Sequence, residues 1–451
     1  MLDGKWLKQQ AEKVRRADYI DPELYRKYGV KRGLRNNDGT GVLVGLTTIG
    51  NVHGYVMNEG EKQPIPGELF YRGIDVEDIV AADKREHRFG YEETAYLLIF
   101  GELPTGRQLV EWKRLVGASR RLSDGFKENA IMRNPPKDLM NALARAVLFA
   151  YAFDASGAPD DLSIENCLAQ SIELIGAIPT IAAYAYQAKA HYHDGASLML
   201  RNPDPAKSTA ENLLMMTRED GKYTKLEAEI LDLALILHAE HGGGNNSSFT
   251  THVVTSSFTD LYSSVAASVL SLKGSRHGGA NLRVMRQMEE IKTQVKNWRD
   301  PKAVAKYLER IADGKAGDRT GLIYGLGHAV YTVSDPRARM LRAKAEQLAK
   351  EKGRMDEMRL FEAIEELGPG IIKARHPRAE DVCANVDLYS GFVYDMLGIP
   401  KELYTPLFAV ARCVSWCAHR MEELINEGPI IRPAYKPIFH PREYVPLKKR
   451  R

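Results

Sequence analysis

The chain has 451 residues, enough for two or three domains or for one large core with a smaller lobe. Hydrophobic residues make up 44% of the sequence and charged residues 27%, which is the composition of a globular protein rather than a disordered or membrane protein. A formal net charge of +4 is too small to indicate nucleic-acid binding, which needs basic residues concentrated on one face. An anionic ligand must therefore be met by local charges.

The N-terminal residues and the apolar stretches give no sign of export or membrane insertion. Residues 1–16 mix acidic with basic side chains and lack the apolar run of a secretory signal, so we expect a cytoplasmic location. The most apolar stretch, residues 174–188, is too short for a bilayer span and contains Pro179, so we interpret it as a pair of buried helices. No C-x-x-C pair occurs among the cysteines, which argues against a disulfide framework or a structural zinc site; they are Cys167, Cys383, Cys413 and Cys417.

Strand-like sequence is scarce along the chain. Residues 41–56 are the only stretch with β-branched character, and Pro64 to Gly67 predict a turn before a helix that reaches Ala82. Helical periodicity dominates afterwards, so the rest of the chain is predicted to be mainly helical; the expected helices cover residues 91–100, 139–153, 164–189, 226–241, 260–274 and the stretch from 404 onward.

Two glycine-rich turns carry histidines. His277 precedes Gly278 and Gly279 between two expected helices, and His328 follows Gly325-Leu326-Gly327. Because glycine has no Cβ, such turns allow the backbone to approach a ligand closely. The alternative for either histidine is a helix cap or a hydrogen bond in the core.

Further polar residues stand at the ends of expected helices. His241 ends the apolar stripe of the helix over 226–241, directly before three glycines. The pair Asp335-Pro336 is a helix-start signal, which sets Arg337 in the first turn of the following helix. Arg412 lies off the apolar stripe of the last long helix, so we expect it to face a cleft, although a buried ion pair is the alternative.

Several common active-site motifs are missing from the sequence. There is no Walker lysine motif, no G-x-G-x-x-G after a strand and no G-x-S-x-G elbow. A zinc site at His238 and His241 has ligands at i and i+3, but a third ligand is not evident. Asp387 has the spacing of an N-cap for a helix beginning near Leu388, which is its alternative to a catalytic role.

In their order and spacing, the motifs over residues 71–433 resemble the citrate synthase family. The most specific are His277 to Asn281, Gly325 to Arg337, and Asn385-Val386-Asp387 followed by Ser390-Gly391. Supporting motifs occupy residues 71–73, 101–105, 179–184 and 241–245 with Ser248. The resemblance implies an all-α fold and a homodimer. It also implies a large domain of two segments, 1–277 and 388–451, the second with a C-terminal dimer arm, and a small domain, 278–387, that closes over the substrates.

The resemblance also implies roles for three residues in a condensation of acetyl-CoA with oxaloacetate. Asp387 would remove a proton from the acetyl methyl group, and His277 would hydrogen-bond the forming enol oxygen. His328 would polarise the ketone of oxaloacetate and protonate the new alkoxide. A carboxylate base and a fixed hydrogen-bond donor suit this step, because enolate charge must be met in a water-poor site.

Binding residues follow from the same resemblance. Oxaloacetate would be held by His241, Arg337 and Arg412, with Arg432 donated by the partner subunit; arginine forks match its two carboxylates. The residues expected at CoA are Gly325, Leu326, Gly327, Arg276 and Lys373. No metal and no cofactor is implied beyond acetyl-CoA as co-substrate, and neither nucleic acid nor a membrane is expected as a partner.

Four places depart from the commoner family pattern, and they bear on the CoA contacts more than on the three catalytic residues. They are Arg276, Leu282, Thr332 and Cys383-Ala384. Thr332 stands where many members carry a lysine or arginine near the CoA phosphates. The hypothesis is that other cations compensate, namely Arg276, Lys315, Arg319, Lys373, Arg375 and Arg378.

Three alternative functions remain open on the sequence alone. The first is a 2-methylcitrate synthase that uses propionyl-CoA, because one methylene changes binding by only about 1–3 kcal/mol. The second is a non-catalytic, ligand-sensing homologue, although the presence of His277, His328 and Asp387 argues against it. The third is a metal-dependent hydrolase.

Overall fold

The computed structural model describes residues 4–36, 39–59, 61–377 and 381–450. The chain divides into two compact units, Met1–Leu46 and Thr47–Arg451. The elements of the first unit have no buried residue; they are α1 (Gly4–Asp18), α2 (Pro22–Lys27) and the 3-10 helix η1 (Arg32–Leu34). Every residue predicted to act in the site belongs to the second unit.

The second unit begins with a small antiparallel sheet in the order β1–β2–β3. Its strands are β1 (Gly50–Asn58), β2 (Glu61–Tyr71) and β3 (Ile74–Asp75). The predicted turn from Pro64 to Gly67 is wrong, because both residues lie inside β2. On one side of β2, Pro64 pairs with Tyr55 of β1. On the other side, β3 pairs only with the end of β2, so no strand lies beside Pro64 there. A proline is tolerated at such an edge because its missing N–H costs nothing on the side without a partner strand.

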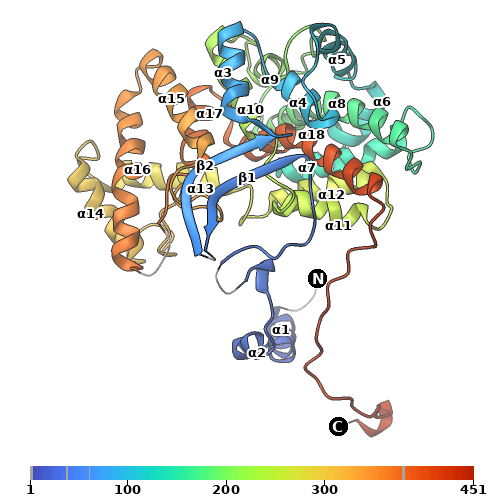
Figure 1. Cartoon of the computed structure of the whole chain (residues 1–451). Helices are drawn as coiled ribbons and strands as arrows, with labels where there is room; N and C mark the ends of the chain where they lie inside the picture. The colour runs from blue at the N-terminus through green and yellow to red at the C-terminus, as the bar shows by residue number, and fades with distance from the viewer. Residues whose placement is uncertain (1–3, 37–38, 60, 378–380, 451) are drawn as a thin grey trace. The chain divides into compact units, whose positions relative to one another are not determined.

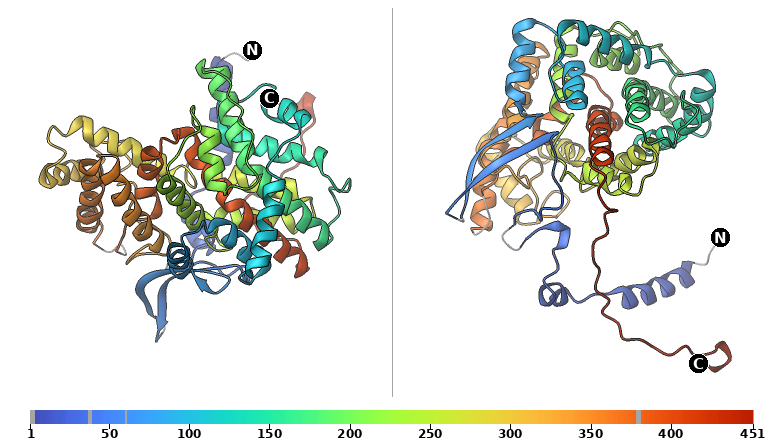
Figure 2. Two further views of the ribbon diagram at one scale, coloured as in Figure 1. Left: turned by 90° about the horizontal axis from the view of Figure 1, so that it is seen from above. Right: turned by 45° about the vertical axis from the view of Figure 1, so that its right-hand side comes forward.

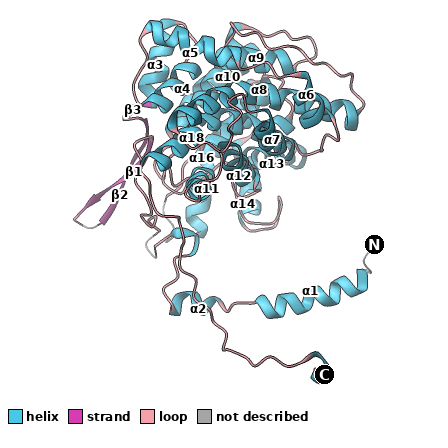
Figure 3. Cartoon of the chain, turned by 90° about the vertical axis from the view of Figure 1, so that its right-hand side faces the viewer, coloured by secondary structure: helices cyan, strands magenta, loops and turns pink. Residues whose placement is uncertain are grey.

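The remainder of this unit is helical, which confirms the all-α class (Figures 1 and 3). Its helices are α3 (Val76–Glu86), α4 (Tyr91–Phe100), α5 (Gly106–Ala118), α6 (Asp124–Phe126), the π-helix η2 (Lys127–Met132), α7 (Leu139–Ala150), η3 (Tyr151–Phe153), α8 (Ile164–Asp194), α9 (Thr209–Thr217), α10 (Lys225–His238), α11 (Asn246–Thr255), α12 (Leu261–Lys273), α13 (Ala280–Gln294), α14 (Pro301–Ala312), α15 (Pro336–Glu351), α16 (Met355–Arg375), α17 (Val386–Met396), η4 (Lys401–Leu403), α18 (Tyr404–Ile425) and η5 (Leu447–Lys449).

The apolar stretch 174–188 is not a pair of helices. It lies within α8, a single helix of 31 residues that continues through Pro179. By length and composition this helix could cross a membrane, so the prediction that this apolar part of the chain is too short for a bilayer span is wrong for the whole of α8. Its apolar window is 72% buried inside the protein, however, which is the environment of a core helix.

Helix α18 lies at the centre of the larger group of helices (Figure 2). It packs against α4, α8, α10, α11 and α12, and residues 404–421 are all buried. A helix that is buried on every side needs no amphipathic stripe, so the predicted stripe describes only part of its contacts. The position of Arg412 on α18 is therefore fixed by core packing.

A second group of helices follows α12 in the chain. α17 packs against α13 and α15, and α14 packs against α16. Helix α10 contacts both α15 and α17, so the segment that ends at His238 lies beside this group. A small domain with the boundaries 278–387 stays a prediction.

Candidate active site

Two segments far apart in the sequence, residues 325–327 and 383–385, are paired through hydrogen bonds. The Gly327 N–H donates to Cys383 O at 2.8 Å, and the Asn385 N–H donates to Gly325 O at 2.9 Å. The Asn385 side-chain amide also donates to Gly327 O at 2.8 Å. His328 directly follows the first segment and Asp387 lies just beyond the second, so this pairing brings the histidine turn and the carboxylate together.

The glycines of this turn serve the chain's own packing. Gly325 and Gly327 have φ values of +91° and +90°, which favour glycine. A Cβ on Gly325 would lie 2.7 Å from Leu388 Cδ1 and 3.1 Å from Leu388 Cα. The close approach that the sequence predicted toward a ligand is thus, at Gly325, an approach to α17.

Asp387 lies in the first turn of α17. The side chain of Asn385 caps this helix by accepting the Asp387 N–H at 3.0 Å, so the alternative of Asp387 as the N-cap is wrong. Its carboxylate accepts no hydrogen bond from any residue that the structure describes. Burial raises the pKa of Asp387 to about 6, while the charge of Arg337 acts in the opposite direction. At neutral pH it is an ionised carboxylate with increased basicity.

His328 is held in one tautomer by its own turn. Its Nδ1 accepts the N–H groups of Val330 and Tyr331, both at 3.1 Å. Since Nδ1 is an acceptor, the neutral ring carries its proton on Nε2. The ring stacks on Tyr331 at 4.7 Å between centroids and meets the ring of His241 edge-on at 5.0 Å. His328 is therefore prepared to donate from Nε2.

His241 and His277 are both neutral imidazoles at physiological pH. Burial, with a contribution from Arg337, holds the pKa of His241 well below its usual range. Burial, followed by the charge of Arg412, lowers the pKa of His277 to about 4. The Nε2 atoms of both rings are buried without a hydrogen-bond partner in the described part of the chain. A ligand oxygen would satisfy each of them.

His241 does not end a helix, as the sequence pattern suggested. α10 stops at His238, and His241 lies beyond its C-cap in the loop that leads to the glycines. His277 does lie on the predicted turn, between α12 and α13.

Arg337 lies in the first turn of α15, as predicted, after the N-cap Asp335. Its guanidinium is buried and forms two hydrogen bonds with the carboxylate of Asp335, at 3.0 and 2.8 Å. Burial opposes the charge, but Asp335 outweighs it and raises the pKa of Arg337. The sequence signalled Asp335 only as a helix cap, and its second role as the partner of Arg337 was missed.

Arg412 is fully buried and does not face an open cleft, contrary to the prediction. Its Nε donates to His238 O at 2.7 Å and its guanidinium lies over the Phe408 ring at 4.7 Å. Nη1 and Nη2 have no hydrogen-bond partner among the described residues. Burial lowers the pKa of Arg412 to about 10, with Glu240 acting against that change. The residue is thus a cation at neutral pH with two donors available to an anion.

Other predicted residues are not brought to this cluster. Arg432 is exposed beyond α18, and Arg276 is exposed on the turn before His277. Thr332, which stands where many family members carry a lysine or arginine, is buried, so this position is not at the surface. Three of the remaining expected CoA cations form ion pairs: Lys373 pairs with Asp381 at 3.0 Å, and both Lys315 and Arg375 pair with Asp313. Arg319 is exposed, and Arg378 lies outside the described residues. Which of them contact CoA stays a prediction.

Sequence reasoning also missed the contacts that two aromatic side chains, Tyr331 and Phe408, make in the site. Tyr331 stacks on His328, approaches His241 at 5.8 Å and lies under Arg337 at 5.8 Å. His238 stacks on Phe408 at 4.2 Å and is fully buried. Within the described residues, no group of three metal-ligating side chains includes His238 and His241. The zinc site considered for this pair therefore lacks its third ligand.

Neutral imidazoles, a carboxylate of raised pKa and two buried arginines are the kinds of group that acid–base enzyme sites use. The model of the family "Citrate synthase, C-terminal domain" matches residues 37–434. The chain belongs to the citrate synthase family.

Relatives and solved structures agree with this assignment along most of the chain. The citrate synthase of Haloferax volcanii is 35% identical over 90% of this chain and 94% of its own length. The 2-methylcitrate synthase 1 of Corynebacterium glutamicum is 32% identical over 93% of this chain and 98% of its own length. The citrate synthase of Thermoplasma acidophilum, solved in a ternary complex with carboxymethyl coenzyme A and oxaloacetate, has a TM-score of 0.75 and 28% identity over 93% of this chain and 99% of its own.

The pairing of the two segments predicts an effect of Gly325→Ala on stability. An alanine there would have to adopt the existing positive φ, and its Cβ would meet Leu388, so we expect the free energy of unfolding to fall by about 1–3 kcal/mol. Urea unfolding followed by circular dichroism measures this change. Gly370→Ala on α16 is the matched control, because an added Cβ there meets nothing within 4 Å. Equal stability of the two variants would contradict the account of this turn.

Proposed function

We propose that this protein is a citrate synthase, which joins the acetyl group of acetyl-CoA to oxaloacetate and releases citrate and CoA. The observation that carries the proposal is the pairing of residues 325–327 with 383–385, since it sets a histidine donor and a basic carboxylate in one cluster. The family match and the bound ligands named for the Thermoplasma acidophilum structure support the choice of substrates.

In the proposed reaction, the Asp387 carboxylate removes a proton from the acetyl methyl group. The neutral His277 ring hydrogen-bonds the thioester oxygen as enol character develops there. A fixed donor of this kind contributes about 3 kcal/mol to the transition state. A carboxylate whose pKa is about 6 is a better base than an ordinary aspartate and is still ionised at pH 7.

The new carbon–carbon bond forms between the acetyl methyl carbon and the ketone carbon of oxaloacetate. His328 donates its Nε2 proton to the ketone oxygen, which becomes the hydroxyl of the product. Its tautomer suits this step because Nδ1 already accepts two backbone N–H groups. Water then cleaves the thioester, which yields citrate and free CoA and makes the overall reaction favourable. In the course of this step His328 regains its Nε2 proton and Asp387 releases the proton that it took, so both return to their starting states.

Two buried arginines and His241 are proposed to hold oxaloacetate. Arg412 offers two unpaired nitrogens and Arg337 supplies a second positive charge, although its fork is already engaged with Asp335. A dicarboxylate would balance both charges in a site where the donors are already fixed.

The proposed active form is a homodimer in which Arg432 of the partner subunit completes the oxaloacetate site. Arg432 is exposed and lies in a segment without regular structure between α18 and η5. Large apolar side chains of the same segment and of η5 are also exposed, which is typical of a surface that a second chain covers; they are Tyr435, Phe439 and Tyr444 in the segment and Leu447 in η5.

Propionyl-CoA is the alternative acyl donor. Relatives that are 2-methylcitrate synthases match the chain over nearly its whole length. The one additional methylene of propionyl-CoA changes binding by only about 1–3 kcal/mol. The ratio of rates with the two thioesters decides between the two activities.

The role of Asp387 as the base predicts both a mutant effect and a pH dependence. Thiol release from acetyl-CoA should depend on oxaloacetate, and Asp387→Asn should lower kcat by about 10²–10⁴-fold with the fold intact. Because the base must be ionised, kcat/KM of the wild-type enzyme should rise with pH up to about 6 and then level off. The rate of thiol release, followed from about pH 5 to about pH 8, measures both effects.

Asp395→Asn, on the far end of the same helix, is the control for a general effect of charge removal. An Asp387→Asn enzyme that keeps full activity would contradict the proposal, as would a wild-type profile that falls between about pH 5 and 7.

A second prediction tests the shared site. Asp387→Ala and Arg432→Ala should each inactivate the homodimer. Mixing the two inactive chains should restore activity, because one site of each mixed dimer then has an intact Asp387 from one chain and an intact Arg432 from the other. If Arg432 acts within its own chain, every site lacks one residue and the mixture stays inactive. Activity after refolding of mixed, differently tagged chains measures the outcome.

A further inference from the structure

A second cluster of histidines and carboxylates lies apart from the residues assigned to catalysis. His252 lies on α11, and His419 and Glu422 lie one turn apart on α18. One ligand atom from each of these residues lies within 4.8 Å of the other two. These three residues form the His252 cluster.

The two imidazoles of the His252 cluster face each other through one nitrogen each. His252 Nε2 lies 3.1 Å from His419 Nδ1, and the same His419 atom lies 3.7 Å from Glu422 Oε2. In a tetrahedral zinc site with metal–ligand bonds of about 2.0–2.1 Å, neighbouring ligand atoms are about 3.3 Å apart. Two of the three ligand–ligand distances are therefore close to that spacing, and the third lies within 4.8 Å.

The other nitrogen of each imidazole is hydrogen-bonded to a carboxylate. His252 Nδ1 lies 2.7 Å from Glu423 Oε2, and His419 Nε2 lies 3.1 Å from Glu240 Oε2. A carboxylate behind each ring is the usual arrangement around metal-bound histidines, because it fixes the tautomer and makes the ligand nitrogen more basic. Here both rings have this support.

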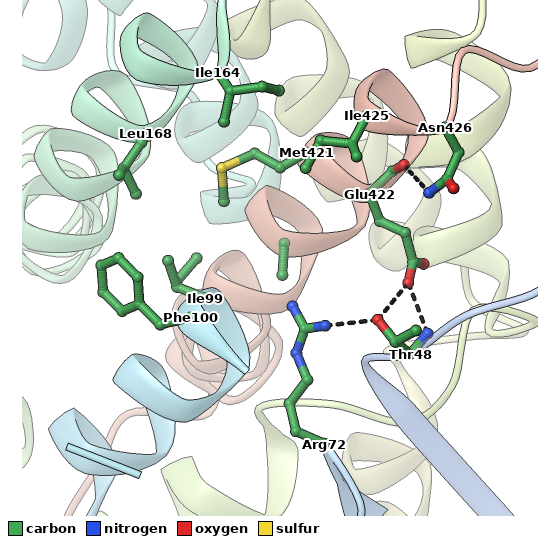
Figure 4. Close-up of a pocket in the computed structure, with 11 residues that line it drawn as sticks. Thr48, Arg72, Ile99, Phe100, Ile164, Leu168, Met421, Glu422, Ile425 and Asn426 are labelled. Atoms are coloured by element: carbon green, nitrogen blue, oxygen red, sulfur yellow. Dashed lines mark hydrogen bonds between the residues drawn. The ribbon is translucent and has the colours of Figure 1, made fainter. Parts of the chain in front are cut away.

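Glu422 has one oxygen engaged and one available. Its Oε1 accepts the Thr48 N–H at 2.7 Å and the Thr48 hydroxyl at 3.0 Å, and Arg72 donates to the same hydroxyl (Figure 4). Its Oε2 is buried and accepts no hydrogen bond from the described chain. Glu422 also lines the pocket shown in Figure 4. The nearest positive group to this oxygen is the His419 ring, 3.7 Å away, so a bound cation would take the place of the proton on His419 Nδ1.

We propose that His252, His419 and Glu422 bind a divalent transition metal ion, with zinc as the best match, in a structural site. Two imidazole nitrogens and one carboxylate oxygen are a donor set that zinc accepts, with water as the fourth ligand. The ion would join α11, α18 and the segment at Thr48 that leads into β1, and none of its ligands is assigned to catalysis.

The competing explanation is a hydrogen bond between the two rings. In that case a proton lies between His252 Nε2 and His419 Nδ1, and the cluster only links α11 to α18. The two explanations differ in whether the purified protein retains zinc and in how the affinity responds to the carboxylate behind His252.

The test uses the whole protein and the ions Zn²⁺ and Co²⁺ alone. After zinc loading and gel filtration against a weak chelator, the wild-type protein should retain about one zinc ion per chain. Cobalt in the same site should show the intense visible bands of tetrahedral coordination. Zinc should also raise the midpoint of thermal unfolding, since a ligand that binds the folded state stabilises it.

Graded variants keep the test decisive even if one of them folds poorly. His252→Gln removes a ligand and should abolish retention, whereas Glu423→Gln keeps all three ligands and should weaken zinc binding by about 10–100-fold. His191→Gln, which removes an exposed imidazole at the end of α8, should bind zinc as the wild type does. No retained zinc in the wild type, or unchanged affinity in both His252→Gln and Glu423→Gln, would overturn the proposal.

Discussion

The structure is organised around a guanidinium placed in the core with two of its three nitrogens unpaired. Arg412 lies on the buried central helix α18, and among the described residues only its Nε finds a hydrogen-bond partner. Burial of an incompletely paired charge costs several kcal/mol, so core packing alone would not favour it. The cost is understandable if a carboxylate of the substrate supplies the missing hydrogen bonds. The apolar contacts along the rest of α18 keep the charge in place when no ligand is bound.

Burial is the main reason that the neighbouring histidines are neutral, and the charge of Arg412 adds to this effect. With Arg337 it helps to hold His241 in the neutral form, and it does the same for His277. A neutral imidazole can donate a hydrogen bond without adding a positive charge to those of Arg337 and Arg412. Such rings could therefore polarise a carbonyl group without electrostatic repulsion from the two arginines. Asp387 is the complementary case, because burial there favours the protonated form and so strengthens the base. Desolvation thus prepares the donors and the base in one environment.

Sequence patterns were sufficient for the helical class, for Arg337 in the first turn of α15 and for the turns that carry His277 and His328. They failed where contacts between distant segments decide the outcome. The strand β2 includes Pro64 because β1 pairs on only one side of it, and α8 passes through Pro179. The pairing of residues 325–327 with 383–385 and the double role of Asp335 depend on the folded chain. For that reason the glycines were assigned to a ligand, and Arg412 was expected at a cleft instead of in the core.

The measurement that tests the central claim most directly compares Arg412→Met with Arg420→Met in thermal unfolding, with and without oxaloacetate. Arg420 is a buried arginine of the same helix whose terminal nitrogens are bonded to Ser264 and Thr259. If Arg412 is kept for the substrate, Arg412→Met leaves the ligand-free protein at least as stable as the wild type and abolishes the stabilisation by oxaloacetate. Arg420→Met then shows the reverse, with lower stability and an intact response to oxaloacetate. An Arg412→Met protein that is still stabilised by oxaloacetate would contradict the account.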